Sequence, residues 1–280
     1  MLRLKSLSLA IALLITFSIA PHAYADDVVQ DPTKTESPSP PAARNAANTF
    51  VATHGMKGLA MAVRNTDDLK KLNVSWWYTW GWCDEPGCVP MSYNMQKPPS
   101  CPHTLLVGNE PNAAATNGGP VTPTDAASRV IAIENTCPNT LLVVGNVAYD
   151  DWSRAGGWGD GHNWLAQFLH TYRTLRGREY AQAIGVHCYS QRLASYCLEG
   201  LSKLRQLYHG EMWVTEFGIF SGDAAQFSIL QNHVAANFTR YAAYTNRQPH
   251  THQSWEVSTG VELVNGDGTL TTIGVVYASR

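Results

Sequence analysis

The 280-residue sequence has no excess of positive charge, no common metal-binding spacing and no apolar run of membrane-spanning length. Its 20 lysines and arginines are matched by 22 aspartates and glutamates, so we expect no nucleic-acid partner and no anionic-membrane partner. Its six cysteines include no Cys-x-x-Cys pair, and there is no His-Glu-x-x-His motif. The sequence therefore predicts neither a metal site nor a cofactor.

The N-terminal segment has the pattern of a secretory signal. Arg3 and Lys5 precede a mostly apolar run over residues 7–20, and Ala23-Tyr24-Ala25 is typical of a cleavage site. A membrane anchor is the alternative, but the run is shorter than the ~20 apolar residues that a spanning helix needs. We therefore predict a signal peptide over residues 1–25 and a secreted protein, found outside the cell or in the cell wall.

Residues 26–48 are rich in proline, serine, threonine and alanine and contain almost no large apolar side chains. Such a composition predicts a disordered lead-in. Residues 49–280 have a length that suits one α/β barrel as well as two small domains. The strand count below favours one domain, and we expect it to be monomeric.

The six cysteines of an exported chain indicate disulfides, and six allow 15 pairings. Two cysteines open similar segments, Cys101-Pro-His-Thr-Leu-Leu-Val and Cys137-Pro-Asn-Thr-Leu-Leu-Val. If these segments are neighbouring parallel strands in register, about 4.8 Å apart, their cysteines can form a bridge. Short sequence separation ranks two further pairs highly: Cys83–Cys88 and Cys188–Cys197.

Eight short apolar or aromatic runs have the character of strands. They are residues 58–63, 74–80, 88–93, 104–107, 141–147, 183–189, 212–217 and 253–257. Helical spacing lies between several of them, over residues 125–135, 163–175, 196–208 and 224–244. Strands that alternate with helices predict a parallel sheet, and eight such strands at this length predict a single (β/α)8 TIM barrel.

Two glutamates stand at the ends of predicted strands. Glu110 follows the run Thr104–Val107 within Asn-Glu-Pro-Asn, and Glu216 lies in Met-Trp-Val-Thr-Glu-Phe-Gly. α/β barrels keep their chemistry at the carboxyl ends of their strands, and the fourth and seventh strands lie across such a barrel. Two carboxyl groups facing one cleft are what a glycosidase requires, one to protonate the departing oxygen and one to face the anomeric carbon.

The order Asn109-Glu110-Pro111 and Trp213-Val214-Thr215-Glu216-Phe217-Gly218 resembles the retaining glycosidases of clan A. More narrowly, residues 57–279 resemble glycoside hydrolase family 128, the single-domain β-1,3-glucanases. The further motifs that carry this resemblance are Trp76-x-Tyr78-x-Trp80, Val89-Pro90-Met91, Trp164 with Phe168, His187-x-Tyr189, Trp255 and Asp267-Gly268-x-Leu270-Thr271. The resemblance implies that Glu110 is the acid/base and Glu216 the nucleophile.

The remaining candidate residues would bind the sugar or hold the carboxylates. Asn109 could hydrogen-bond a sugar 2-hydroxyl, Tyr189 could hold an oxygen of Glu216, and His187 could support either glutamate, with ordinary barrel packing as the alternative for the last two. Aromatic side chains suit the C–H faces of pyranose rings. We expect this role for Tyr78, Trp80, Trp158 and Trp255, with Trp255 at the end of the predicted eighth strand.

The expected function is that of a secreted retaining endo-β-1,3-glucanase, whose partner is a β-glucan polysaccharide or oligosaccharide. A barrel that binds β-1,3-glucan fragments without cleaving them is the first alternative, and the presence of both glutamates argues against it. A clan A hydrolase for another β-linked glycan, such as β-1,4-glucan or mannan, is the second, and the Trp76-x-Tyr78-x-Trp80 motif argues against that.

Overall fold

The computed structural model describes residues 55–113, 120–150, 161–251 and 257–280, which belong to one compact unit over Thr49–Arg280. Its centre is a single sheet of eight parallel strands in the spatial order β2-β1-β8-β7-β6-β5-β4-β3. The strands are β1 (Met56–Ala60), β2 (Trp76–Tyr78), β3 (Met91–Ser92), β4 (Thr104–Val107), β5 (Leu141–Asp150), β6 (Ala183–Ser190), β7 (Glu211–Ile219) and β8 (Arg240–Tyr244).

The two edge strands of this sheet nearly meet. Trp77 of β2 forms a parallel bridge with Cys88, three residues before β3, and the Val89 amide donates to the Trp77 carbonyl at 2.8 Å. The sheet is thus an almost closed barrel with helices between most of its strands, which confirms the predicted (β/α)8 fold.

The eighth strand was placed wrongly by the sequence pattern. The predicted helix over residues 224–244 ends at Asn237, and Arg240–Tyr244 forms β8 between β1 and β7. The alanines of Arg240–Tyr244 favour a helix locally. The segment is nevertheless almost wholly buried and completes the sheet, so its pairing with neighbouring strands outweighs its helix propensity. Most of the predicted strand 253–257 lies outside the described residues, and Val257 is not in a strand.

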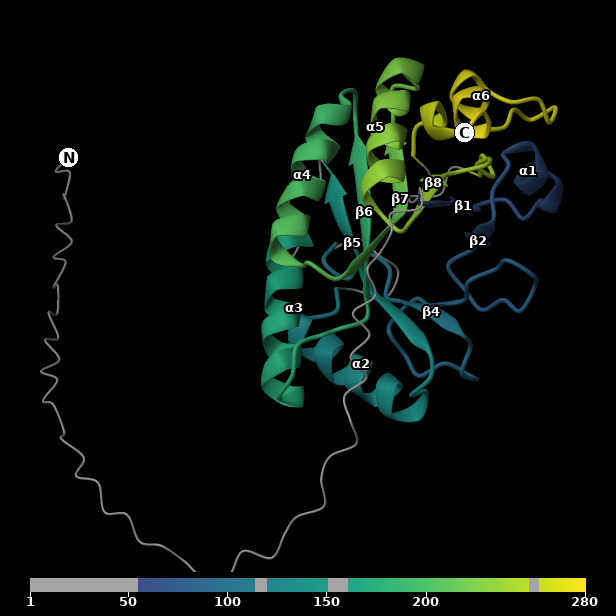
Figure 1. The fold of residues 1–280 in the computed structure, drawn as a ribbon. Helices are drawn as coiled ribbons and strands as arrows, with labels where there is room; N and C mark the ends of the chain where they lie inside the picture. The colour runs from purple at the N-terminus through teal and green to yellow at the C-terminus, as the bar shows by residue number, and fades with distance from the viewer. Residues whose placement is uncertain (1–54, 114–119, 151–160, 252–256) are drawn as a thin grey trace, which may run out of the picture. The chain divides into compact units, whose positions relative to one another are not determined.

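The long helices cover one part of the barrel. In Figure 1, α3 (Gly161–Arg176), α4 (Ala194–Leu207) and α5 (Ala224–Asn237) stand side by side along β5, β6 and β7, and α2 (Pro123–Thr136) follows β4. The first turn of α2 is capped by Thr122, whose hydroxyl accepts from the Asp125 amide, with Pro123 at its start. The chain from β2 to β4 is described without a break and holds no helix.

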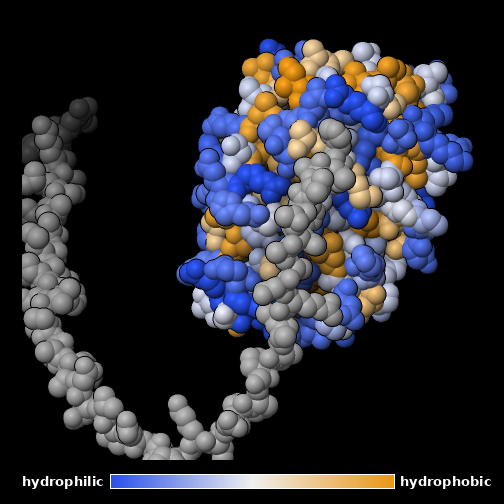
Figure 2. Space-filling view, in the orientation of Figure 1, coloured by the Kyte–Doolittle hydropathy of each residue, from blue (hydrophilic) through white to orange (hydrophobic). Residues whose placement is uncertain are grey.

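Three short helical segments complete the description: α1 (Thr66–Lys71), η2 (Thr259–Val261) and α6 (Thr272–Ala278). Among the described residues, no helix is long and apolar enough to cross a membrane. On the face shown in Figure 2, hydrophobic residues occur in small groups among hydrophilic ones.

Strand alternation separates two apolar layers. Leu106 belongs to the cluster inside the barrel, whereas its neighbours Leu105 and Val107 belong to the cluster between strands and helices. The same alternation places Trp76 and Tyr78 inside and Trp77 outside. The interior is therefore lined with aromatic rings directly below the glutamates.

All three disulfides ranked highly by spacing are present: Cys83–Cys88, Cys101–Cys137 and Cys188–Cys197. The register of β4 on β5 pairs Thr104 with Leu141, three and four residues after Cys101 and Cys137. The two strands are parallel neighbours and the bridge forms, as expected, although the register is one residue away from that of the two aligned segments.

Candidate active site

Glu110 stands beyond the carboxyl end of β4. After Val107 the chain turns through Gly108 and Glu110, whose φ angles of 89° and 45° are both positive. The Glu110 amide donates to the Asn146 carbonyl of β5 at 3.0 Å, which fixes the turn against the next strand. Its side chain is about one quarter exposed and so can reach a ligand from solvent.

Glu216 lies in the carboxyl-terminal half of β7 and is 4% exposed. Its Oε1 accepts from the Tyr78 hydroxyl at 2.6 Å and from Trp80 Nε1 at 2.9 Å, and its Oε2 accepts from the Tyr189 hydroxyl. These three donors come from two strand regions, β2 and β6, that flank the barrel interior. They fix one orientation of the carboxylate.

His187 of β6 stands between the two glutamates. Its Nδ1 lies 2.9 Å from Glu110 Oε1, and its Nε2 lies 3.4 Å from Glu216 Oε1. One oxygen of each carboxylate and a ring nitrogen of His187 lie within 4.8 Å of one another. The structure thus brings together two carboxylates from opposite sides of the barrel through one imidazole.

Burial raises the pKa of the Glu216 carboxyl, the positive charge of His187 would lower it, and the negative charge of Glu110 raises it further. Hydrogen bonds from Tyr189 and Tyr78 act in the opposite direction to burial. Burial and the charge of Glu216 raise the pKa of both tyrosines well above the usual value, so each remains a hydroxyl donor.

Asn146 is a contributor that sequence reasoning missed. It is fully buried in β5 with a φ of 48°, donates to the Gly108 carbonyl at 2.8 Å and accepts from the Thr215 hydroxyl at 2.8 Å. It therefore links the residue before Asn109 to the residue before Glu216. A lone amide within the apolar run Leu-Leu-Val-Val-Gly-Asn-Val was the available signal.

Tyr244 was also missed, since it was assigned to a helix. At the end of β8 its ring meets Trp80 edge-on at 5.7 Å and Tyr189 at 5.9 Å. Asn109 lies beside Glu110, and its backbone amide donates to the Tyr93 carbonyl at 3.0 Å. Aromatic rings thus surround the glutamates, and we call this group of side chains the catalytic bowl: Tyr78, Trp80, Tyr189 and Tyr244 with Glu110 and Glu216.

Two expected aromatic residues, Trp158 and Trp255, lie outside the described residues. The residues that the structure does bring to Glu110 and Glu216 are His187, Tyr189, Tyr78, Trp80 and, by chain adjacency, Asn109.

Within the part of the chain that the structure describes, two groups of side chains have the donor types that could hold a metal ion. Cys83 and Cys88 of the first group are joined in a disulfide, which removes their thiolates. In the second, His187 Nδ1 hydrogen-bonds Glu110 Oε1 at 2.9 Å, and His187 Nε2 lies 3.4 Å from Glu216 Oε1. That the protein needs no metal stays a prediction.

A (β/α)8 barrel with two facing glutamates above an aromatic interior is the class of site used by barrel glycosidases. Residues 58–277 match the family model described as the glycosyl hydrolase catalytic core, so the chain belongs to that family. This confirms the family expected from the sequence motifs. No curated protein matches the chain.

Solved structures of glycoside hydrolase family 128 share the fold. An endo-β-1,3-glucanase from Sorangium cellulosum has a TM-score of 0.60 and 22% identity, with 80% of this chain and 98% of that chain covered. An Amycolatopsis mediterranei endo-β-1,3-glucanase in complex with laminaritriose has a TM-score of 0.58 and 22% identity, with 80% of this chain and 98% of that chain covered. A Trichoderma gamsii oligosaccharide-binding protein has a TM-score of 0.58 and 17% identity, with 80% of this chain and 93% of that chain covered.

Proposed function

We propose that this protein hydrolyses β-1,3-glucan by a retaining double displacement, with Glu216 as nucleophile and Glu110 as acid/base. The proposal rests on the different surroundings of the two neighbouring glutamates. Glu216 is buried and held by three donors, whereas Glu110 is partly exposed and shares His187 with it. A fixed, multiply hydrogen-bonded carboxylate suits attack on carbon, and a solvent-reaching carboxyl suits proton exchange.

In the first step Glu110 donates its proton to the departing glycosidic oxygen while a Glu216 oxygen forms a bond to the anomeric carbon. The product is a covalent glycosyl-enzyme and a shortened glucan. In the second step Glu110 takes a proton from water, the water oxygen attacks the same carbon, and the bond to Glu216 breaks. Both glutamates return to their starting state.

The substrate assignment rests on the family and on the lining of the bowl. Two of the fold relatives are endo-β-1,3-glucanases, and one was solved with laminaritriose. Asn109, next to the acid/base, would bind a sugar 2-hydroxyl, and the partly exposed Trp80 ring would pack against the pyranose at the site of cleavage. Tyr78 was expected to contact the sugar, but it is fully buried and instead holds Glu216. Trp158 and Trp255 are proposed to extend the same surface.

We further propose that the protein is exported through residues 1–25, that residues 26–48 are a linker and that residues 49–280 act as a monomeric endo-acting catalytic domain. Three disulfides are typical of an oxidising compartment and support export.

One assay tests the activity. The purified protein should release reducing sugar from laminarin much faster than from carboxymethylcellulose or mannan, and Glu216→Gln should release almost none. Faster release from carboxymethylcellulose or mannan would assign another β-linked glycan. Rapid appearance of oligosaccharides of many lengths would support endo action, and glucose alone would contradict it.

A barrel that binds glucan without cleaving it is the second candidate, because one fold relative is an oligosaccharide-binding protein. The carboxylate pair favours hydrolysis. Tight binding of laminarihexaose by the wild-type protein without any cleavage would decide for the binding protein.

A further inference from the structure

A second pocket, of about 530 Å³, lies at the opposite end of the barrel from the glutamates. Its lining includes the first residues of three strands: Trp76 of β2, Thr104 of β4 and Arg240 of β8. Parallel strands begin at the same edge, and Glu110 follows the other end of β4. The strand alone separates the two levels by roughly 10 Å.

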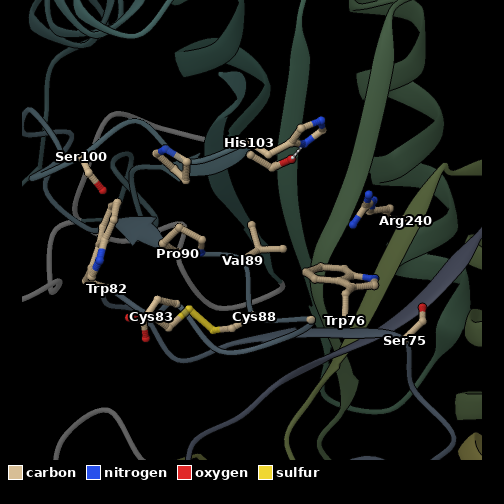
Figure 3. Close-up of a pocket in the computed structure, with 14 residues that line it drawn as sticks. Ser75, Trp76, Trp82, Cys83, Cys88, Val89, Pro90, Ser100, His103 and Arg240 are labelled. Carbon is tan, nitrogen blue, oxygen red and sulfur yellow. Dashed lines mark hydrogen bonds between the residues drawn. A yellow bond between two sulfur atoms is a disulfide. The ribbon is translucent and has the colours of Figure 1, made fainter. Parts of the chain in front are cut away.

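Trp82 forms one wall of this pocket (Figure 3). Its indole is 41% exposed, although the loop that carries it is firmly held. The Cys83–Cys88 disulfide closes the loop, and the Trp77 amide donates to the Gly87 carbonyl at 2.9 Å. A large apolar ring presented to solvent on a fixed loop is a binding surface more than a packing element, because it buries little of its own area.

Arg240 forms the opposite side. Its guanidinium stacks 4.4 Å from the Trp213 ring and 6.0 Å from the Trp76 ring, and Figure 3 shows it beside Trp76. Within the described part of the chain, the guanidinium has no hydrogen-bond acceptor. Its position is thus set by the rings, while its N–H donors are available to a ligand.

The charge of the lining selects the class of ligand. One guanidinium and one carboxylate, Asp84, offset each other, with His103 and Ser100 as further polar groups. A polyphosphate would need several cations, and a lipid chain would need an apolar lining. Aromatic rings with a few balanced polar groups instead suit a neutral pyranose, and the volume falls within the roughly 300–1,000 Å³ of small-molecule sites.

We propose that this pocket is a second binding site for a β-glucan segment, separate from the catalytic bowl, with the Trp82 ring as its platform and Arg240 as donor to the sugar hydroxyls. The proposal rests on the proposed function for the identity of the sugar. A site at the far end of the barrel would hold an insoluble or long glucan near the enzyme without occupying the cleft.

The test uses the full protein in a Glu216→Gln background, which prevents cleavage, with laminarihexaose as the probe in isothermal titration calorimetry. Two binding events are expected. Adding Trp82→Ala should remove one event and leave the other unchanged, whereas Trp82→Phe, which keeps a ring, should retain both. Leu175→Ala on α3, another exposed apolar residue, is the matched control and should change nothing.

Two results would overturn the second site: two events that persist in Trp82→Ala, or a single event that does not depend on Trp82. A single event that Trp82→Ala abolishes would instead support the second site and count against the catalytic bowl as a glucan site. In the cleaving enzyme, Trp82→Ala should lower the rate on insoluble curdlan several-fold and leave kcat/KM for laminaritriose unchanged.

Discussion

Glu110 and Glu216 share one imidazole but differ in exposure, and this difference supports the separate roles proposed for them. The Glu110 side chain is about one quarter exposed, whereas Glu216 is enclosed by Tyr78, Trp80 and Tyr189. A group that exchanges protons with a leaving oxygen and then with water must reach both. A nucleophile needs a fixed orientation instead.

The acid/base role predicts a dependence on the leaving group. Glu110→Gln should hydrolyse laminarin about 10²–10⁴-fold more slowly, since it cannot supply the proton. The Glu110→Gln variant should still form the glycosyl-enzyme at a near-normal rate from a dinitrophenyl glycoside, because dinitrophenolate leaves without being protonated. Glu216→Gln is the control and should lose both activities. Equal loss on both substrates in Glu110→Gln would remove the acid/base role from Glu110.

The hydrogen bonds to Glu216 predict a shift in pH dependence. Burial raises the pKa of Glu216 and the Tyr78 hydroxyl opposes this, so Tyr78→Phe should raise it further. The nucleophile acts ionised, and the acid limb of the kcat/KM profile should therefore move to higher pH. Tyr208→Phe loses a hydroxyl that donates to the Gln182 carbonyl at 2.6 Å, far from Glu216, and should leave the limb in place.

If the acid limb of the Tyr78→Phe profile lies at the same pH as that of the wild-type enzyme, the Tyr78 hydrogen bond does not lower the pKa of Glu216. Because Glu110 and Glu216 interact, the measured limb belongs to the pair and is compared between variants, not assigned to one residue.

At the scale of elements, the packing of α4 on the sheet depends on the absence of a side chain. A Cβ on Gly200 would stand 1.9 Å from Tyr149 Cε1 of β5. In an exposed helix Gly→Ala stabilises by about 1 kcal/mol, but here overlap with an aromatic ring costs more than that gain. We expect Gly200→Ala to lower the free energy of unfolding by about 1–3 kcal/mol in urea titrations.

Ser202→Ala, two residues further along α4 and exposed, is the matched control. It should be neutral or slightly stabilising, because only helix propensity changes there. A stabilised Gly200→Ala protein would show that α4 can move away from β5 at little cost.

The elements that sequence patterns predicted well are those with a long apolar periodicity. Trp164 and Phe168 set the buried stripe of α3, and Thr104–Val107 was placed to the residue. β8 could not be recognised, because Arg-Tyr-Ala-Ala-Tyr continues a helical composition and only its pairing with β1 and β7 makes it a strand. The wrong eighth strand also hid Tyr244.

The candidate site divides in the same way. Glu110 and Glu216 could be found because each breaks an apolar strand within a recognisable motif. Asn146 and Tyr244 belong to no recognisable motif, and both contact residues that are distant in the sequence. Asn146 donates to Gly108, 38 residues before it, and the Tyr244 ring meets Tyr189, 55 residues before it. Contacts of this kind follow from the closed barrel and cannot be read from local sequence.

Across the whole molecule, two buried carboxylates contribute to stability with opposite signs. Asp68 of α1 is fully buried; burial acts to raise its pKa, but hydrogen bonds from Arg247 and Asn246 outweigh burial and lower it. Arg247 contacts it through Nε and Nη2, both at 2.9 Å, and joins α1 to the segment after β8. Glu216 has a raised pKa instead.

The raised pKa of Glu216 means that the folded state holds its proton more strongly than the unfolded chain. Stability therefore falls as pH rises through the ordinary glutamate pKa and up to the folded value. Glu216→Gln removes this cost, so its Tm should exceed that of wild type at pH 7, by about 2–4 °C for each kcal/mol. The difference should shrink below about pH 4.5, where both states of wild type are protonated.

Asp68→Asn is the matched variant, for which we expect the opposite change in Tm at pH 7. The lowered pKa of Asp68 gives stability that is present above its unfolded pKa and is lost as pH falls through the folded value. Asp68→Asn should therefore melt below wild type at pH 7 and approach it in acid. Thermal melts from pH 3 to 7 measure both variants, and a Glu216→Gln protein less stable than wild type at pH 7 would contradict the inferred strain at the nucleophile.

The closure of the barrel also fixes the stereochemistry of the proposed reaction. β4 and β7 approach across the sheet so that one oxygen of each glutamate lies within 4.8 Å of the other. Retaining enzymes hold their carboxyl groups about 5–5.5 Å apart, whereas inverting enzymes need roughly 6.5–9.5 Å to admit a water between carboxylate and sugar. Oxygens of Glu110 and Glu216 that lie within 4.8 Å of each other are closer to the retaining spacing than to the inverting one, which supports the proposed double displacement.

Glu216 would then attack the anomeric carbon directly, and water would later attack from the face that the leaving group left. Two inversions give net retention, so laminarin should first yield a β-anomer. Proton NMR in the first minutes of hydrolysis, before mutarotation, reads the anomeric signals. With Glu216→Ala and added azide, the single remaining displacement should give an α-glycosyl azide. An α-anomer appearing first from the wild-type enzyme would rule out double displacement and the roles proposed for both glutamates.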